Sequence, residues 1–294
     1  MSRFNSEPID IIVPWVNSND LIWKQEFEYW KEKETGIKDP CRYRDWGFIK
    51  FVLRSINENC PWCRYIFLIL SGPSQIPDWL NINAPKLRII YHKDYIPKEF
   101  LPTFNSNVIE MFFSDIEDLS ENYILINDDM FFCQNKNEDF YFKNNTPVVL
   151  KSTICPSGNT EFNRSILNTR NISNEILKID TKYICWGDHL PICYNKTLQL
   201  FIRSKKDLTK FCVNKFRKDN DITHFLFLDI QNKLNKCIFM NNRGKFYDTS
   251  KLCKINFNTP MICINEGEKT ITKTMVNIYY QLENHFNKKS IFEK

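Results

Sequence analysis

The sequence predicts an α/β fold, with a mostly parallel central sheet flanked by helices and a helix-rich C-terminal part. Short apolar runs rich in β-branched and aromatic residues occupy positions 9–13, 64–70, 87–91 and 123–127. Helical periodicity lies between most of these runs. Alternation of strands and helices is typical of a parallel sheet whose two faces are both covered.

Helices are predicted from the spacing of apolar residues. Trp23, Phe27 and Trp30 recur at helical intervals, and a second helix is predicted around residues 48–56, with Asp45 as its N-cap. Beyond residue 180 the pattern is more helical. Segment 223–235 is typical of a buried helix, and a final amphipathic helix is predicted from Ile271, Met275, Ile278, Leu282 and Phe286.

The length of 294 residues and the 43% hydrophobic content allow one large packed domain. We expect a single domain over residues 1–294, with an α/β part at 9–133 and a helix-rich part at 181–294. Between them, residues 134–180 are predicted to be loops or an insertion, because residues 134–146 and 156–176 are polar, rich in Asn and Ser, and lack a clear period.

Charge and cysteine content restrict the function classes. The net charge of +5 is mild and both signs are interspersed, so no nucleic-acid partner is expected. The basic segment 201–218 either forms an ordinary solvated face or weakly attracts an anionic membrane surface or a polyanionic substrate. No signal peptide or membrane-spanning run is recognised, and eleven scattered cysteines favour a reducing compartment. We therefore expect a cytoplasmic protein, with peripheral membrane association left open.

Two adjacent acids, Asp128 and Asp129, directly follow the apolar run 123–127. If that run is a central strand, both acids lie at its carboxyl end, where such sheets bind ligands. Neighbouring carboxylates beside apolar residues repel each other, so we expect a cation there. Adjacent acids at a strand end are also common turn formers or helix caps, and that alternative stays open.

Other polar residues are candidates for the same site. Asn105 and Asn107 lie at a predicted helix start, where they either cap the helix or leave N–H groups for a phosphate or sugar. His189 is predicted in a loop beside Asp188, as a general base requires, although a lone histidine is more often a packing residue. The Cys60–Cys63 pair closes a predicted helix, which favours a turn over a redox or zinc site.

Taken in order, these clusters resemble the Stealth-type capsular polysaccharide phosphotransferases, the family that includes the catalytic subunit of animal N-acetylglucosamine-1-phosphotransferase. The similar segments include IDIIVPWVNSND, RYRDWGFIKFVLRSINENCPW, YHKDYIPKEFLPTFNSNVIE, LSENYILINDDMFF, HLPICYNK, FRKDNDITHFLF and CINEGE. The resemblance implies a Rossmann-like, GT-A-like sheet and one catalytic domain, in which residues 9–133 bind the donor. It implies transfer of a sugar 1-phosphate from a nucleotide-sugar donor to a hydroxyl of an acceptor oligosaccharide or polysaccharide, releasing a nucleoside monophosphate.

The resemblance also implies a metal site. Asp129 and Asn265 would be ligands of Mg²⁺ or Mn²⁺, and Asp128 would orient Asp129. A phosphoryl group in transit needs its charge neutralised, which a divalent cation does. The last motif has Glu266 where relatives commonly have Asp, so Glu266 is left outside the metal shell.

Further roles follow from the same resemblance. His189 would take the proton of the acceptor hydroxyl, Arg217 would face the phosphate with its planar fork, and Asp221 would hold a neighbouring polar group. Pro14 stands where relatives usually have Thr, which is expected to alter the donor pocket. The residues implied to contact the donor are Trp15, Val16, Asn17, Arg44, Asp45, Asn105 and Asn107.

Two other functions fit the same residues. A metal-dependent glycosyltransferase would use the same donor and cation but release a nucleoside diphosphate. A non-catalytic glycan-binding protein would use its aromatic residues as a sugar platform. The nucleotide released separates the first alternative from sugar-phosphate transfer, and an absence of turnover identifies the second.

Overall fold

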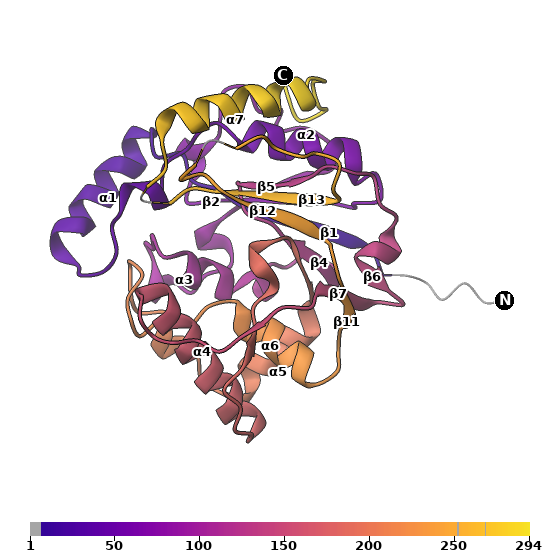
Figure 1. Cartoon of the computed structure of the whole chain (residues 1–294). Helices are drawn as coiled ribbons and strands as arrows, with labels where there is room; N and C mark the ends of the chain where they lie inside the picture. Colours follow the sequence, from indigo (N-terminus) through magenta and orange to yellow (C-terminus); the bar gives the residue numbers. More distant parts are fainter. Residues whose placement is uncertain (1–6, 252, 268) are drawn as a thin grey trace.

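A computed structural model describes residues 7–251, 253–267 and 269–294 of the chain. Its central sheet has five strands in the order β10-β4-β1-β2-β3 (Figure 1). The neighbouring pairs among β1 to β4 run parallel, and β10 runs antiparallel to β4 at the edge. The predicted α/β class with a mostly parallel sheet is therefore confirmed. The strands are β1 (Ile9–Pro14), β2 (Ile66–Leu70), β3 (Leu87–Tyr91), β4 (Asn122–Leu125) and β10 (Ile192–Asn195).

The sheet is buried on both faces, and period-two alternation distributes its side chains between two cores. In β1, Ile11 and Val13 join one hydrophobic cluster while Ile12 joins the other. In β2, Leu68 joins the first cluster and Phe67 the second. Strands covered on both sides appear in the sequence as continuous apolar runs, which is why strands β1 to β4 were predictable.

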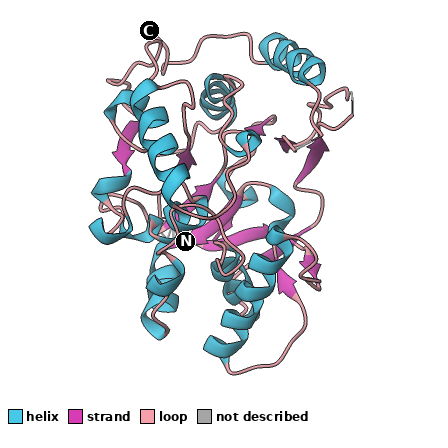
Figure 2. Ribbon diagram, turned by 90° about the vertical axis from the view of Figure 1, so that its left-hand side faces the viewer, coloured by secondary structure: helices cyan, strands magenta, loops and turns pink. Residues whose placement is uncertain are grey.

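Helices and a second sheet cover the two faces. On one side lie α2 (Ile49–Asn59), α7 (Thr272–His285) and the three-stranded sheet β12-β13-β5, made of Gly244–Asp248, Met261–Asn265 and Met130–Phe132 (Figure 1). On the other side lie α3 (Ser106–Met111), α4 (Glu161–Leu177), α5 (Lys196–Lys205) and α6 (Phe225–Lys233). The view turned by 90° shows helices on either side of the strands (Figure 2). The remaining α-helix is α1 (Leu21–Lys33), and the other strands of the described residues are β6 (Phe142–Lys143), β7 (Thr146–Leu150), β8 (Thr153–Ile154), β9 (Ile184–Cys185) and β11 (Ile238–Met240).

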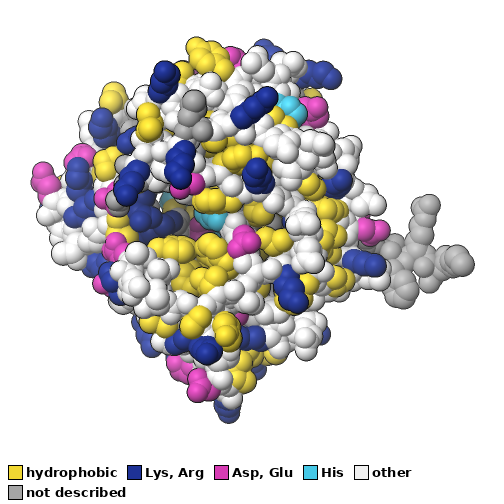
Figure 3. All heavy atoms as spheres, in the orientation of Figure 1, with side chains coloured by type: hydrophobic (Ala, Val, Ile, Leu, Met, Phe, Trp, Pro, Cys, Tyr) yellow, Lys and Arg dark blue, Asp and Glu magenta, His cyan; other side chains and the backbone are white. Residues whose placement is uncertain are grey.

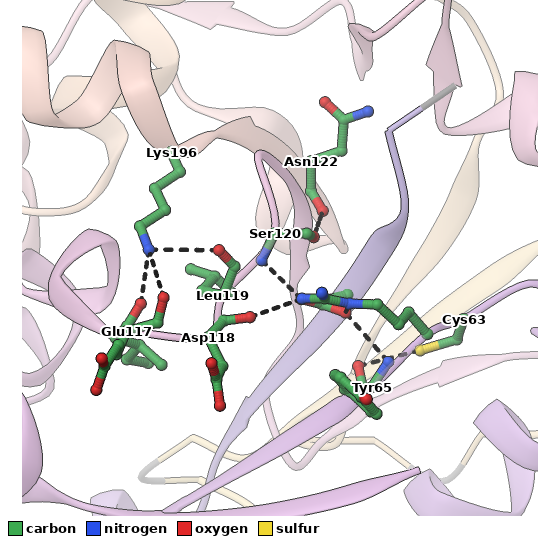
Figure 4. A network of polar contacts seen from close by, with 11 residues as sticks. Cys63, Tyr65, Glu117, Asp118, Leu119, Ser120, Asn122 and Lys196 are labelled. Carbon is green, nitrogen blue, oxygen red and sulfur yellow. Dashed lines mark hydrogen bonds and ion pairs between the residues drawn. The ribbon is translucent and has the colours of Figure 1, made fainter. Parts of the chain in front are cut away.

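A polar network ties the amino ends of the central strands together (Figure 4). The fully buried carboxylate of Asp10 on β1 accepts hydrogen bonds from Arg64 Nε at 2.9 Å and from the backbone N–H groups of Tyr65 at 3.1 Å and Ser120 at 2.7 Å. Lys196 donates to the carbonyls of Ile116, Glu117 and Leu119. This network satisfies buried polar groups at the sheet end opposite the carboxyl ends of the parallel strands.

The prediction of loops at 156–176 is wrong, because α4 occupies residues 161–177. Thr160 caps this helix by accepting from the N–H of Asn163, and its buried stripe includes Ser165, Thr169 and Ser173. These small hydroxyl residues share the buried stripe with the apolar Ile166 and Ile172. Thr169 satisfies its hydroxyl by donating to the Ser165 carbonyl at 2.7 Å.

The N-cap prediction for α2 is also wrong. Phe48 occupies the cap position, and Asp45 instead accepts from the N–H of Gly47 at 2.8 Å, in a turn before the helix. The predictions for α6 and α7 are confirmed, although Ile271 is exposed. The C-terminal part also contains five strands, β9 to β13, among its three α-helices.

The cysteines are all free thiols. Cys60 and Cys63 are buried in the turn between α2 and β2, and burial raises the pKa of both thiols, which confirms a packing role. Within the described ranges, no helix combines the length and apolar character needed to cross a bilayer.

Candidate active site

The acidic pair lies where the sequence places it, in the turn that follows β4 and leads into β5. The turn is closed by a hydrogen bond from the Met130 N–H to the Asn127 carbonyl at 3.1 Å. The N–H of Ile264 on β13 donates to the Asp129 carbonyl at 2.8 Å, which fixes the backbone of the pair against the second sheet. Both aspartates are half-buried at the carboxyl end of the central sheet.

Three carboxyl groups lie close together at this edge. Burial, followed by the charges of Asp129 and Asp45, raises the pKa of Asp128 well above its ordinary range. Burial also raises the pKa of Asp45, although the hydrogen bond that its carboxylate accepts from the Gly47 N–H acts to lower this pKa. A carboxyl group whose pKa is raised partly by two neighbouring carboxyl groups lies where a cation is favourable.

Asp129 is the centre of a potential metal-binding group. Ligand atoms of Asp129, His189 and Cys263 lie within 4.8 Å of one another. Asp129 Oδ1 is buried and has no hydrogen-bond partner among the described residues, whereas Oδ2 lies 3.5 Å from Cys263 Sγ and 3.7 Å from His189 Nε2. An unpartnered buried carboxylate oxygen suits a hard cation. The Asp129 carboxylate therefore fits a hard divalent cation.

Cys263 was not recognised as a site residue from the sequence. Burial and the charges of Asp129 and Asp128 raise the pKa of its thiol, so the S–H remains a donor toward Asp129. Asn265 lies two residues farther along β13, and alternation directs its side chain to the same face as Cys263. This arrangement places an amide oxygen, the ligand type that Mg²⁺ accepts, beside the acidic turn.

His189 is positioned by an unusual backbone turn. Both Asp188 and His189 have left-handed conformations, with φ of 52° and 48°, after Gly187 with φ of 75°. Non-glycine residues adopt this region rarely, and it is enriched at functional sites. The sequence suggested that Asp188 is the acidic partner of His189. In the structure Asp188 instead accepts from Ser152 Oγ, and the carboxylate facing the imidazole is that of Asp129.

A cavity opens beside His189. The space-filling view shows a hollow near the middle of this face, with a histidine inside it, Lys and Arg side chains on one side and hydrophobic side chains on another (Figure 3). His189 and Asn127 belong to the wall nearest the acidic turn. The other lining residues include Asn107, Glu110, Arg217, Lys218, His224, Arg42 and Phe162. The cavity therefore combines a histidine with cations suited to an anionic ligand.

Asp221 organises the polar wall of this cavity. Its fully buried carboxylate accepts from the side-chain amides of Asn105 at 2.7 Å, Asn107 at 3.2 Å and Asn214 at 2.7 Å. Arg217 donates to Ser106 Oγ and lines the cavity. Of the two predicted amides, Asn107 reaches the cavity. Asn105 is fully buried and caps α3, in agreement with the capping alternative.

Glu110 and His224 are cavity residues that the sequence reasoning did not select. Burial raises the pKa of Glu110, the charges of Arg217 and His189 lower it, and the resulting value is about 7. Its Oε2 lies 3.8 Å from His224 Nε2, and burial lowers the pKa of His224 to about 3. A signal was present for Glu110, since it lies three residues after Asn107 and thus on the same helix face.

The predicted donor-binding residues lie around the turn that follows β1. Trp15 is buried and its Nε1 has no hydrogen-bond partner in the described residues. Asn17 exchanges hydrogen bonds with Gln75, at 2.7 Å from its N–H and 3.1 Å to its carbonyl. Val16, between them, is half-buried. Glu266, the residue that follows Asn265 in the chain, forms an ion pair with the guanidinium group of Arg44 at 2.5 Å.

The fold and site together define an α/β enzyme with carboxylate, imidazole and guanidinium groups at one sheet edge. Comparison with known proteins identifies its family. The model of Stealth protein CR2, conserved region 2, matches residues 42–149. The chain is 34% identical over 337 residues to a capsular polysaccharide phosphotransferase WcwK of Streptococcus pneumoniae, covering 99% of both chains.

Other relatives agree with this match. An exopolysaccharide phosphotransferase cps2G of Lactiplantibacillus plantarum is 29% identical over 99% of this chain and 98% of its own. A capsular polysaccharide phosphotransferase fcs1 of Haemophilus influenzae is 26% identical over 93% of this chain and 84% of its own. The chain therefore belongs to the Stealth-type capsular polysaccharide phosphotransferase family and is a transferase. The matched region 42–149 includes the acidic pair but not His189, Arg217 or Asn265.

Proposed function

We propose that the protein transfers a sugar 1-phosphate from a nucleotide-sugar donor to a hydroxyl group of an acceptor glycan. The reaction would serve the synthesis of a capsular or cell-surface polysaccharide and release a nucleoside monophosphate. The observation that carries this proposal is the position of His189, which lies 3.7 Å from Asp129 and also lines the cavity that contains Arg217. A base, a carboxylate and a phosphate-binding cation thus converge on one place.

Mg²⁺ or Mn²⁺ would be held by Asp129 and Asn265, with Asp128 orienting Asp129. The unpartnered Oδ1 of Asp129 and the common face of Cys263 and Asn265 support this assignment. When bound, such an ion neutralises phosphate charge and relieves the repulsion between the acidic side chains. The Cys263 thiol, a protonated donor, is not expected to be a ligand of a hard cation.

The side chains of the protein would perform the proton transfer and the positioning. His189 would accept the proton of the acceptor hydroxyl as that oxygen bonds to phosphorus and the bond between phosphorus and the nucleoside monophosphate oxygen breaks. The Asp129 carboxylate, whose Oδ2 lies 3.7 Å from Nε2 of His189, would help to orient the imidazole. Arg217 would hold two phosphate oxygens with its planar fork. Asp221 would act by holding the amide of Asn107 at the cavity wall.

The donor would lie along the carboxyl ends of β1 and β4, between the cavity and the turn after β1. Trp15, Val16 and Asn17 would contact the nucleotide, with Arg44 and Asp45 nearby. Support comes from the position of these residues at the rim where open α/β sheets bind nucleotides. The pairing of Arg44 with Glu266 connects the segment before α2 to the end of the strand that carries Asn265.

One incubation tests the proposal. The protein is mixed with a panel of nucleotide sugars, an acceptor glycan and Mg²⁺ or Mn²⁺, and the released nucleotide is identified by chromatography. Sugar-phosphate transfer predicts a nucleoside monophosphate and a phosphodiester in the product. Release of a nucleoside diphosphate would identify a glycosyltransferase instead. Binding of glycan with no nucleotide released from any donor would identify a non-catalytic glycan-binding protein.

Peripheral membrane association is a further part of this proposal. Segment 201–218 has exposed Phe201 and Val213 close in sequence to Lys205 and Lys210. Apolar side chains beside lysines suit an anionic lipid surface. Co-sedimentation with vesicles of phosphatidylglycerol and phosphatidylcholine tests this, and binding that is equal with phosphatidylcholine alone would contradict it.

A further inference from the structure

Three side chains near His189 form a row across the sheet β12-β13-β5. Cys263 on β13 is paired in register with Met130 on β5 and with Phe246 on β12. Residues paired in register project from the same face of a sheet, so the three side chains form one row. Met130 and His189 line the same small pocket, and Cys263 contacts Asp129. The Met130 end of the row therefore lies beside His189.

The outer member of this row is exposed. Met130 and Cys263 are buried, whereas Phe246, on the edge strand, is 43% exposed. Its ring centroid lies 6.2 Å from that of His189, with the ring planes 73° apart. A single exposed phenylalanine is common on protein surfaces. One that continues a buried row and contacts an imidazole at the edge of a catalytic site is a candidate ligand platform.

The backbone of β12 is adapted to this close approach. Gly244 lies two residues before Phe246, and a Cβ added at Gly244 would come within 2.6 Å of the Met261 carbonyl and 3.1 Å of Leu190 Cδ1. Leu190 directly follows His189 in the chain. The absence of a side chain at Gly244 thus lets β12 pack against the loop of His189. The position of Phe246 beside the imidazole depends on this packing.

We propose that Phe246 is a stacking platform for the acceptor glycan, on which a sugar ring lies while one of its hydroxyl groups meets His189. This inference rests on the proposed function. Phe246 does not line the cavity that holds Arg217, whereas His189 does, so the histidine separates the phosphate side from Phe246. The nucleophilic hydroxyl must approach from beside the base. The apolar face of a pyranose can cover the exposed face of the Phe246 ring, which lies in edge-to-face contact with the imidazole.

The test uses the full-length protein with four substitutions. Phe246→Ala removes the platform, Phe246→Leu keeps apolar bulk without a ring, and Phe246→Trp keeps a ring. Phe239→Ala is the matched control, because Phe239 is 41% exposed on β11, in a different sheet. Thermal melting establishes that each variant is folded. The probe glycan is a set of oligosaccharide fragments prepared from the surface polysaccharide of the source organism.

Two measurements give the outcome. In the transfer assay, Phe246→Ala and Phe246→Leu are expected to raise the acceptor KM about tenfold while the donor KM changes less than about twofold, and Phe246→Trp is expected to retain the wild-type acceptor KM. Saturation-transfer NMR with the same fragments and Mg²⁺, without donor, is expected to show the same loss of binding. This second measurement needs no turnover, so it tests the platform even if the proposed reaction fails.

Several results would overturn the platform. They are an unchanged acceptor affinity in Phe246→Ala, an equal loss in Phe239→Ala, a change in the donor KM in place of the acceptor KM, or no binding of the fragments by the wild-type protein. The proposed reaction fails separately, if no donor yields a nucleoside monophosphate with the wild-type protein.

Discussion

His189 Nε2 lies 3.7 Å from Asp129 Oδ2, although the two residues come from the loop before β10 and the turn after β4. Antiparallel pairing of β10 with β4 brings these segments together, because Ile192 is opposite Leu125 in the register. The edge strand that departs from the parallel arrangement is therefore the one that delivers the histidine to the acidic turn.

Replacement of His189 tests its role as the base. We expect His189→Ala to lower kcat by about 10²- to 10⁴-fold, the usual contribution of a positioned base, with donor affinity within about threefold of wild type. The measurement is transfer rate together with donor binding by calorimetry. His285→Ala is the control, because His285 is exposed at the end of α7. Unchanged turnover in His189→Ala would remove this residue from the mechanism.

Asp129→Asn tests the metal site. The substitution keeps the size of the side chain but removes the charge at the unpartnered Oδ1. We expect transfer to fall by more than about 100-fold and the affinity for Mg²⁺ or Mn²⁺ to fall with it. Chelation of the wild-type protein should abolish transfer, and added cation should restore it.

The controls for this prediction are an unchanged thermal midpoint in Asp129→Asn and normal activity in Asp118→Asn. Asp118 is an exposed aspartate at the opposite end of the sheet. Full transfer in the presence of chelator would contradict the metal site.

The parts of the fold that the sequence predicted are those with a local signal. Strands β1 to β4 are short apolar runs, and α6 is apolar almost all round. Helix α4 was missed because its segment is rich in Asn and Ser and because Ser165, Thr169 and Ser173 share its buried face with Ile166 and Ile172, which makes the apolar stripe less obvious. The pairing of β5 with β13 joins segments about half a chain apart and has no local signal.

The candidate site shows the same division. Asp129 was predictable because it directly follows an apolar strand, and its position is confirmed. The partner of His189 was not, because Asp188 is its neighbour in sequence while Asp129 is its neighbour in space. Cys263 lies within an apolar run and resembles a core residue until the β5–β13 pairing places it against Asp129.

Glu110 is expected to make stability depend on pH. Burial raises its pKa from 4.5 to about 7, so the folded protein holds the proton more tightly than the unfolded chain does. The resulting stabilisation is complete below the unfolded pKa and is lost as the pH rises through about 7. We expect the free energy of unfolding of the wild type, relative to Glu110→Gln, to fall by at most about 3 kcal/mol over this interval.

Urea denaturation of both proteins at a series of pH values measures this difference. The glutamine variant lacks the titrating group and serves as the reference at every pH. Parallel stability profiles for the two proteins would show that the carboxyl of Glu110 has an ordinary pKa in the folded state.

Asp10 is expected to be a stability residue with no part in catalysis. Its carboxylate is fully buried and is bonded to Arg64, Tyr65 and Ser120 at the amino end of the sheet (Figure 4). Asp10→Ala would leave the Arg64 guanidinium without its carboxylate and two N–H groups without an acceptor. We expect a loss of about 3–5 kcal/mol in the free energy of unfolding, measured by urea denaturation.

Asp118→Ala is the control for this prediction. It should change the free energy of unfolding by less than about 0.5 kcal/mol, because Asp118 contributes only its carbonyl to Arg64 and its side chain is exposed. Transfer activity per folded molecule should remain at the wild-type level in both variants, and a selective loss of activity in Asp10→Ala would connect this end of the sheet to the active site.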